Sequence, residues 1–102
     1  MRIDGFDWND GNLAKCQKHG VSIEEIETLF RGGAQAAPDR KHSDEEQRQL
    51  AVGRSTTGRP MFVVFTIRQR DGLALVRPIS ARYMHAKEIE RYEQTGSSLS
   101  DR

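Results

Sequence analysis

The sequence predicts one small α+β domain in which two short helices precede an antiparallel meander sheet and a third helix follows it. Its length of 102 residues suits a single domain. The first third of the chain carries helix start and stop signals, and three later apolar segments are separated by short turns. With 35% hydrophobic and 30% charged residues, the domain has a modest core.

Two helices are expected before the sheet. Asn9 or Asp10 can cap a helix, and they predict one over about 11–19. Ser22 and Glu25 have the S-x-x-E spacing of a capping box, which predicts a second helix over about 23–31. Short glycine-containing segments end both helices, so the two should form a hairpin.

Five segments are strand candidates. The strongest are Leu50 to Ser55, Met61 to Arg68 and Leu73 to Ser80. Their connectors are short and contain Gly or Asp-Gly, so consecutive strands should pair in antiparallel hairpins. The segments 6–8 and 34–38 are weaker candidates.

The end of the sheet and the last helix have their own signals. Phe62–Phe65 is apolar on both faces of a strand, as in the middle of a covered sheet. Pro78 lacks a backbone donor, so its strand is expected to be an edge strand or to bulge there. A helix over 84–94 follows. We therefore expect a domain at 1–96 and a disordered tail at 97–102.

Positive charge is concentrated in the predicted strands. The net charge of the chain is only +1, but residues 51–82 hold six cations and one acidic residue. All six cations are arginine, which binds phosphate through two parallel hydrogen bonds. Arginine on exposed strands also promotes solubility and protects sheet edges, so both interpretations stay open. The six are Arg54, Arg59, Arg68, Arg70, Arg77 and Arg82.

Several classes of protein do not fit the sequence. No apolar run approaches the roughly 20 residues of a membrane span, and the first residues do not resemble a signal peptide, so we expect a cytoplasmic protein. Cys16 is the sole cysteine, and the three histidines stand far apart. Neither a metal site nor a phosphate-binding glycine loop is indicated, so no metal and no cofactor is expected.

An arginine-rich sheet fits RNA cleavage. The 2′-hydroxyl of RNA can attack the neighbouring phosphorus without a metal, given a base, a cation and an acid. Arg54, Arg77 and Arg82 could meet at one phosphate, His42 could carry a proton, and Tyr83 could stack on a base. A single histidine in a polar segment is more often simply solvated, so the spacing alone is a weak signal.

A series of motifs resembles the BrnT toxins. They occur in order over about residues 4–94, nearly the whole chain. The motifs are Phe6-Asp7-Trp8-Asn9, Lys18-His19-Gly20-Val21-Ser22, His42-Ser43-Asp44-Glu45-Glu46, Gly53-Arg54-Ser55, Phe62-Val63-Val64-Phe65-Thr66 and Ile79-Ser80-Ala81-Arg82.

The resemblance implies a toxin of a type II toxin–antitoxin system, with a RelE-like ribonuclease fold, that inhibits translation by cutting RNA. It also implies a BrnA-like antitoxin with a ribbon-helix-helix domain, which binds the toxin in a hetero-oligomer and supplies the only contact with DNA. The family's basic and polar positions fall on Lys18, His19, His42, Arg54, Arg77 and Arg82. Of these, Arg54, Arg82, His42 and Arg77 are expected to act in catalysis. Lys18 and His19 are expected to bind RNA, as are Arg59 and Tyr83, which are added for their charge and aromatic ring.

A second interpretation stays open. A degenerate, non-catalytic module could use the same basic sheet to bind an antitoxin-like partner or nucleic acid, because acidic peptides and phosphates are both attracted to arginine. A purely structural protein without nucleic-acid contact ranks last.

Overall fold

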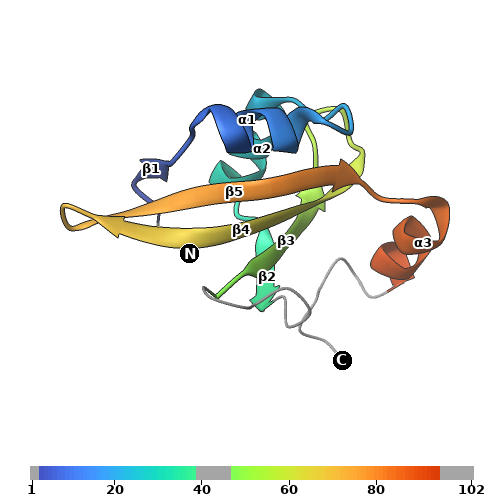
Figure 1. Ribbon diagram of the computed structural model, residues 1–102. Helices are drawn as coiled ribbons and strands as arrows, with labels where there is room; N and C mark the ends of the chain where they lie inside the picture. Colours follow the sequence, from blue (N-terminus) through green and yellow to red (C-terminus); the bar gives the residue numbers. More distant parts are fainter. Residues whose placement is uncertain (1–2, 39–46, 95–102) are drawn as a thin grey trace.

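The computed structural model describes residues 3–38 and 47–94, and the strands among them form one five-stranded sheet (Figure 1). The predicted α+β class, with three helices, is confirmed; the predicted tail at 97–102 lies outside the described residues. The order across the sheet is β1-β5-β4-β3-β2. Along the chain the elements are β1 (Gly5–Phe6), α1 (Asp10–Gln17), α2 (Ile23–Arg31), β2 (Gln35–Pro38), β3 (Gln49–Arg54), β4 (Pro60–Arg70), β5 (Leu73–Tyr83) and α3 (Ala86–Gln94).

The sheet is mixed. Strands β2 to β5 pair antiparallel with their neighbours, but β1 pairs parallel with β5, with Gly5 opposite Leu75 and Phe6 opposite Val76. The prediction of an antiparallel meander was therefore wrong for the sheet as a whole. The prediction failed because short turns specify only the hairpins between consecutive strands. Strand β1 is far from β5 in the sequence, so no turn specifies how these two strands pair.

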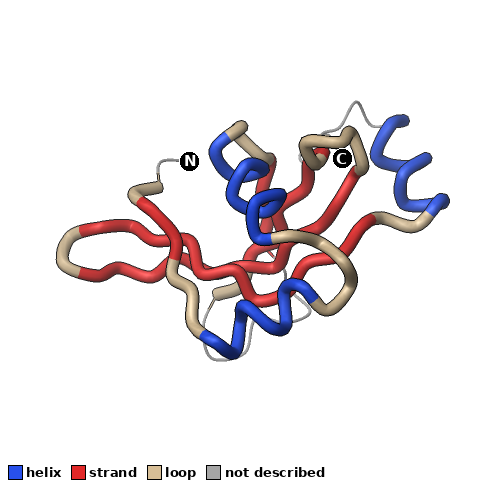
Figure 2. Tube along the Cα trace, turned by 90° about the horizontal axis from the view of Figure 1, so that it is seen from above, coloured by secondary structure: helices blue, strands red, loops and turns tan. Residues whose placement is uncertain are grey.

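Capping fixes the two helices that cover the sheet. Asn9 and Asn12 form a reciprocal capping box at the start of α1, and Ser22 and Glu25 form the predicted one at the start of α2. Figures 1 and 2 show both helices crossing the same face of the sheet, whereas α3 lies beyond the end of β5. No helix in the described ranges is long and apolar enough to span a membrane.

The hydrophobic core lies between α1, α2 and the sheet. Phe30 of α2 packs edge-on against Phe65 of β4, with ring centroids 4.8 Å apart. Burial raises the pKa of the Cys16 thiol to about 11, so it behaves as a small apolar side chain. The buried cluster comprises Cys16, Val21, Ile26, Leu29, Phe30, Ala51, Met61, Val63, Phe65, Val76 and Ala81.

The opposite face of the sheet, here called the open face, is covered less completely. Along β4, Met61 and Val63 are buried on the helix side, while Phe62 and Val64 are half-buried on the open face. The alternation places residues of β3 and β5 that pair with Phe62 and Val64 on this face as well. Arg82, which pairs with Phe62, therefore shares the open face with apolar side chains.

A bulge at Pro78 sets the register of β5. Phe65 pairs with Pro78 and Val64 with Ser80, so one residue of β5 has no partner in β4. The predicted bulge is confirmed. The buried Asn12 side chain donates from Nδ2 to the carbonyl oxygens of Pro78 (2.8 Å) and Asp7 (3.0 Å). Asn12 thereby ties the bulge to the segment between β1 and α1.

Candidate active site

Arg82 lies on the open face near the end of β5. It pairs with Phe62 in the register, and its guanidinium carbon lies 4.8 Å from the Phe62 ring centroid. Nη1 and Nη2 each donate a 2.8 Å hydrogen bond to one oxygen of Glu88, so the pair is bidentate. These bonds lower the pKa of Glu88 to about 2 and raise the pKa of Arg82.

Arg54 is the last residue of β3 and lies at the same end of the sheet. Its Nη1 donates to the carbonyl oxygen of Gly58 (3.0 Å), and its Nη2 donates to Oε2 of Glu93 (3.1 Å). The guanidinium carbon also lies 5.5 Å from the ring centroid of Tyr92. Because β4 separates β3 from β5, the backbones carrying Arg54 and Arg82 are about 10 Å apart across the sheet.

Helix α3 therefore contacts both arginines with carboxylates. Glu88 also accepts a 2.8 Å hydrogen bond from the backbone N–H of His85, which fixes its side chain at the start of the helix. No residue of α3 is buried. The ion pairs with Arg82 and Arg54 are therefore contacts between an otherwise unburied helix and the sheet.

Tyr83 follows Arg82 and points to the helix side of the sheet. Its hydroxyl lies 2.8 Å and 2.9 Å from the two carboxylate oxygens of Glu25, and Arg59 stacks 3.5 Å from its ring centroid. Burial and the Glu25 carboxylate raise the pKa of Tyr83. Partial burial acts to raise the pKa of Glu25, but hydrogen bonds from Ser22, Tyr83 and Ser55 together lower it. Tyr83 and Arg59, both expected to bind RNA, are therefore in direct contact.

Arg77 lies elsewhere on the open face. Its Nη1 is 3.6 Å from Oδ2 of Asp7, which also accepts a hydrogen bond of 3.4 Å from Arg70. Arg77 is five positions before Arg82 in β5, a separation of about 15 Å along the strand. The structure therefore brings Arg54 and Arg82 to one end of the sheet but does not bring Arg77 to them.

Of the remaining expected site residues, two lie in the turn between α1 and α2, and one lies outside the described residues. Lys18 and His19 are exposed in the turn between α1 and α2. His42 lies outside the described residues. No group of three or more potential metal-ligating side chains occurs within 3–38 and 47–94.

Sequence reasoning missed the acidic partners of the site. The capping-box pattern identifies Glu25 only as a helix cap, and no sequence pattern assigns a role in the site to Glu88 or Glu93. Glu88 stands three residues after His85, a typical position for an acidic residue in the first turn. That signal predicts a helix start, but it does not reveal that the chain turns back to place Glu88 on Arg82.

The arrangement is suited to binding an anion. A carboxylate held by two parallel guanidinium hydrogen bonds occupies a position that two oxygens of a phosphate could take. The carboxylates of Glu88 and Glu93 thus occupy two positions on the open face where negatively charged oxygen atoms can bind. An RNA phosphate can occupy them only after exchange with these carboxylates.

Comparison with known proteins places this arrangement in a family. Curated protein sequences gave no significant match. A family model described as the ribonuclease toxin BrnT of type II toxin–antitoxin systems matches residues 8–88, which include Arg54 and Arg82 and most of the sheet. The chain therefore belongs to the BrnT family of ribonuclease toxins of type II toxin–antitoxin systems.

Proposed function

We propose that this protein is an endoribonuclease toxin that cleaves RNA by attack of the 2′-hydroxyl, without a metal ion, and so inhibits translation. One observation carries the proposal: Arg54 and Arg82 lie at the same end of the open face, and each already holds a carboxylate. Guanidinium groups that bind carboxylate oxygens in this way also bind phosphate oxygens.

In the proposed reaction Arg82 and Arg54 bind the phosphate and stabilise its developing negative charge. The 2′-oxygen forms a bond to phosphorus, and the bond from phosphorus to the 5′-oxygen breaks, leaving a 2′,3′-cyclic phosphate. One group accepts the 2′-proton, and another gives a proton to the leaving oxygen. His42 is our candidate for one of these proton transfers because its ordinary pKa is close to neutrality.

Residues at the same end of the sheet are proposed to bind the rest of the RNA. Arg59 is exposed and adds positive charge beside Tyr83. Tyr83 lies on the helix side of the sheet, with its hydroxyl bonded to Glu25 and Arg59 stacked on its ring, so it is proposed to contact RNA together with Arg59. Lys18 and His19 are exposed and are proposed to contact more distant phosphates.

A type II toxin has an antitoxin partner. We propose that this partner is BrnA-like, contacts DNA through a ribbon-helix-helix domain, and forms a cytoplasmic hetero-oligomer with the toxin. Phe62 and Val64 support an interface on the open face, because they offer apolar surface beside positive charge.

The sharpest test of the chemistry uses a short RNA with a mapped cleavage site. We expect cleavage in the presence of EDTA, a 2′,3′-cyclic phosphate on the product, and no cleavage when the nucleotide before that bond lacks its 2′-hydroxyl. Cleavage of the 2′-deoxy substrate, or complete loss of activity in EDTA that added metal restores, would contradict the mechanism.

A second candidate is the non-catalytic binding module. The observation that favours it is that α3 carboxylates hold both arginines, which closes them to phosphate in the structure described. The same assay distinguishes the two functions, because the binding module retains salt-dependent RNA or partner binding but produces no cyclic phosphate.

A further inference from the structure

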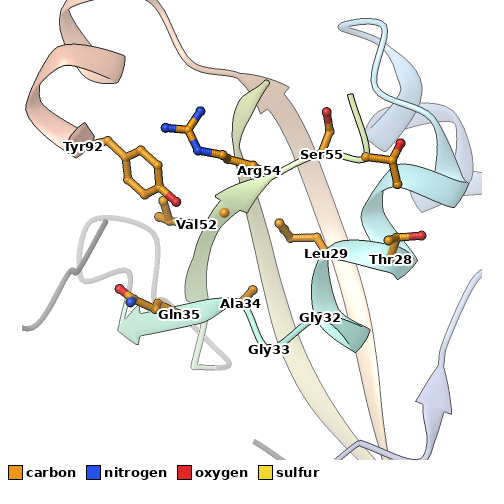
Figure 3. A pocket seen from close by; sticks show the side chains of 12 residues that line it. Thr28, Leu29, Gly32, Gly33, Ala34, Gln35, Val52, Arg54, Ser55 and Tyr92 are labelled. Carbon is orange, nitrogen blue, oxygen red and sulfur yellow. The ribbon is translucent and has the colours of Figure 1, made fainter. Parts of the chain in front are cut away.

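A cavity of about 320 Å³ lies beside Arg54, between the end of α2, the start of β2, the end of β3 and α3 (Figure 3). Tyr92 lies on one side of it and Thr28 and Leu29 lie on the other. Arg54 and Ser55 line the end of β3, and Gln35 lines the start of β2. Its volume is at the lower end of the range for small-ligand sites.

The cavity exists because one strand is shorter than its neighbour. Strand β2 begins opposite Val52, so Gly53 and Arg54 extend past it in the described part of the chain. A Cβ atom on Gly53 would overlap Cδ1 of Leu29, so a larger residue there would push Leu29 from its place. Gly32 and Gly33 form another part of the wall and add no side chain.

The lining offers the contacts that single-stranded nucleobases use. Proteins stack such bases on aromatic rings or arginine planes and form hydrogen bonds to their edges. Here Tyr92 supplies the ring, Arg54 lies 5.5 Å from its centroid, and Gln35 supplies an amide. Hydroxyl groups come from Thr28 and Thr56, whereas the Ser55 hydroxyl is already bonded within the turn that follows β3.

We infer that this cavity is a nucleobase-binding pocket that holds the base of the nucleotide whose phosphate is bound by Arg54. The inference rests on the proposed function, because it takes Arg54 as a phosphate-binding residue. Tyr92 stacks on the base, and Gln35 and the hydroxyls contact its edge. The pocket thus gives the ribonuclease a preference for particular bases at the cleavage site.

The test measures binding separately from cleavage. The four 3′-nucleoside monophosphates and ribose 5-phosphate, which has no base, are titrated into the full chain and followed by NMR. We expect at least one nucleotide to bind five or more times more tightly than ribose 5-phosphate, with signals of the pocket residues shifting. Equal binding of all five compounds would overturn the inference.

Variants assign the preference to the pocket. Tyr92→Ala should abolish the advantage of the best nucleotide, Tyr92→Phe should keep it, and Gln35→Ala should change the ranking of the four bases. Gln17→Ala, an exposed glutamine on α1, is the matched control. Retention of the full preference in Tyr92→Ala and Gln35→Ala would also overturn the inference.

Cleavage mapping then separates this inference from the proposed function. If Gln35→Ala cuts RNA at different bases, the pocket sets specificity. If the wild type binds nucleotides in the pocket but cleaves no RNA, the ribonuclease proposal fails while base recognition stands. If it cleaves RNA and Gln35→Ala and Tyr92→Ala leave the choice of bases unchanged, the pocket inference fails while the ribonuclease proposal stands.

Discussion

Arginine side chains contact carboxylates at both ends of the open face, but different structural elements carry the carboxylates. At one end Arg70 and Arg77 face the carboxylate of Asp7. At the other end Arg82 and Arg54 face Glu88 and Glu93. In each case two arginines meet acidic side chains, so the kinds of charged group present do not distinguish the two ends.

The supports differ in how firmly they hold the carboxylate. The Asp7 side chain is only 10% exposed, and the backbone N–H of Asp7 donates to the carbonyl oxygen of Val76 (2.8 Å). Asn12 holds the Asp7 carbonyl oxygen as well. Glu88 and Glu93 belong to α3, which buries no residue. A carboxylate on such a helix can move aside, whereas Asp7 can move only with β1.

The firmness of these supports determines which arginines a substrate can reach. Exchange of phosphate for Glu93 costs little, because both partners of the Arg54–Glu93 pair are about half exposed. Exchange for Asp7 would leave a nearly buried carboxylate without its partners. We therefore expect the α3 end to act on RNA and the Asp7 end to support the fold.

The largest expected effect is on catalysis at the α3 end. Arg82→Ala should lower the rate of RNA cleavage by about 100-fold or more, because a preorganised donor to the reacting phosphate is lost. Arg70→Ala removes an arginine from the other end of the same face and should leave the rate within about threefold of wild type. Rates on one RNA at equal protein concentration compare the two. Equal losses would show that both ends contribute alike.

Next in size is the contribution of Asn12 to stability at the Asp7 end. Asn12→Leu should lower the free energy of unfolding by about 2 kcal/mol, because a buried and a partly buried carbonyl oxygen lose their donor and the α1 cap is weakened. Urea unfolding measures the change, with the exposed Gln17→Ala as control. A loss no greater than that of the control would show that water replaces Asn12 at the bulge.

Sequence reasoning succeeded where structure is set locally. The Ser22–Glu25 capping box predicted the bounds of α2, and the Asp71–Gly72 turn predicted the β4–β5 hairpin. Both turn residues have positive φ, as the turn type requires. Such signals depend on neighbours in sequence, so one chain suffices to read them.

Contacts between distant segments were not predictable in this way. The parallel pairing of β1 depends on where β5 lies in three dimensions, and two residues carry too little pattern to show its direction. The separation of Arg77 from Arg82 became visible only with the full length of β5 and the place of Asp7. From the sequence, the arginines form one group because they share a charge. In the structure they form two groups, because those at one end contact Asp7 and those at the other contact residues of α3.

A smaller effect is expected for Arg77, because Arg70 still faces Asp7 when Arg77 is removed. Arg77→Ala should lower the free energy of unfolding by about 1 kcal/mol and leave RNA cleavage nearly unchanged. Urea unfolding and the cleavage assay measure the two quantities on the same preparation. If cleavage falls as far as in Arg82→Ala while stability is preserved, Arg77 belongs to catalysis, as the sequence suggested.

The smallest effect is on the pH dependence of stability. The pKa of Glu88 is about 2 in the folded protein against an ordinary value of 4.5, chiefly because Arg82 donates hydrogen bonds to its charged form. A lowered pKa means that the pair stabilises the fold fully above pH 4.5 and that this contribution is lost as the pH falls toward 2. Both side chains are partly exposed to water, which keeps the effect small.

Glu88→Gln isolates this contribution from that of other acids. The variant should be less stable than wild type at pH 6, and the difference should shrink as the pH falls from 4.5 toward 2. In the wild type the backbone amide signal of His85, which donates to Glu88, should titrate with a midpoint near pH 2. A midpoint near 4.5 would mean that α3 does not hold Glu88 against Arg82 in solution. The arginine would then be open to phosphate without any exchange, and the contrast between the two ends of the open face would be greater still.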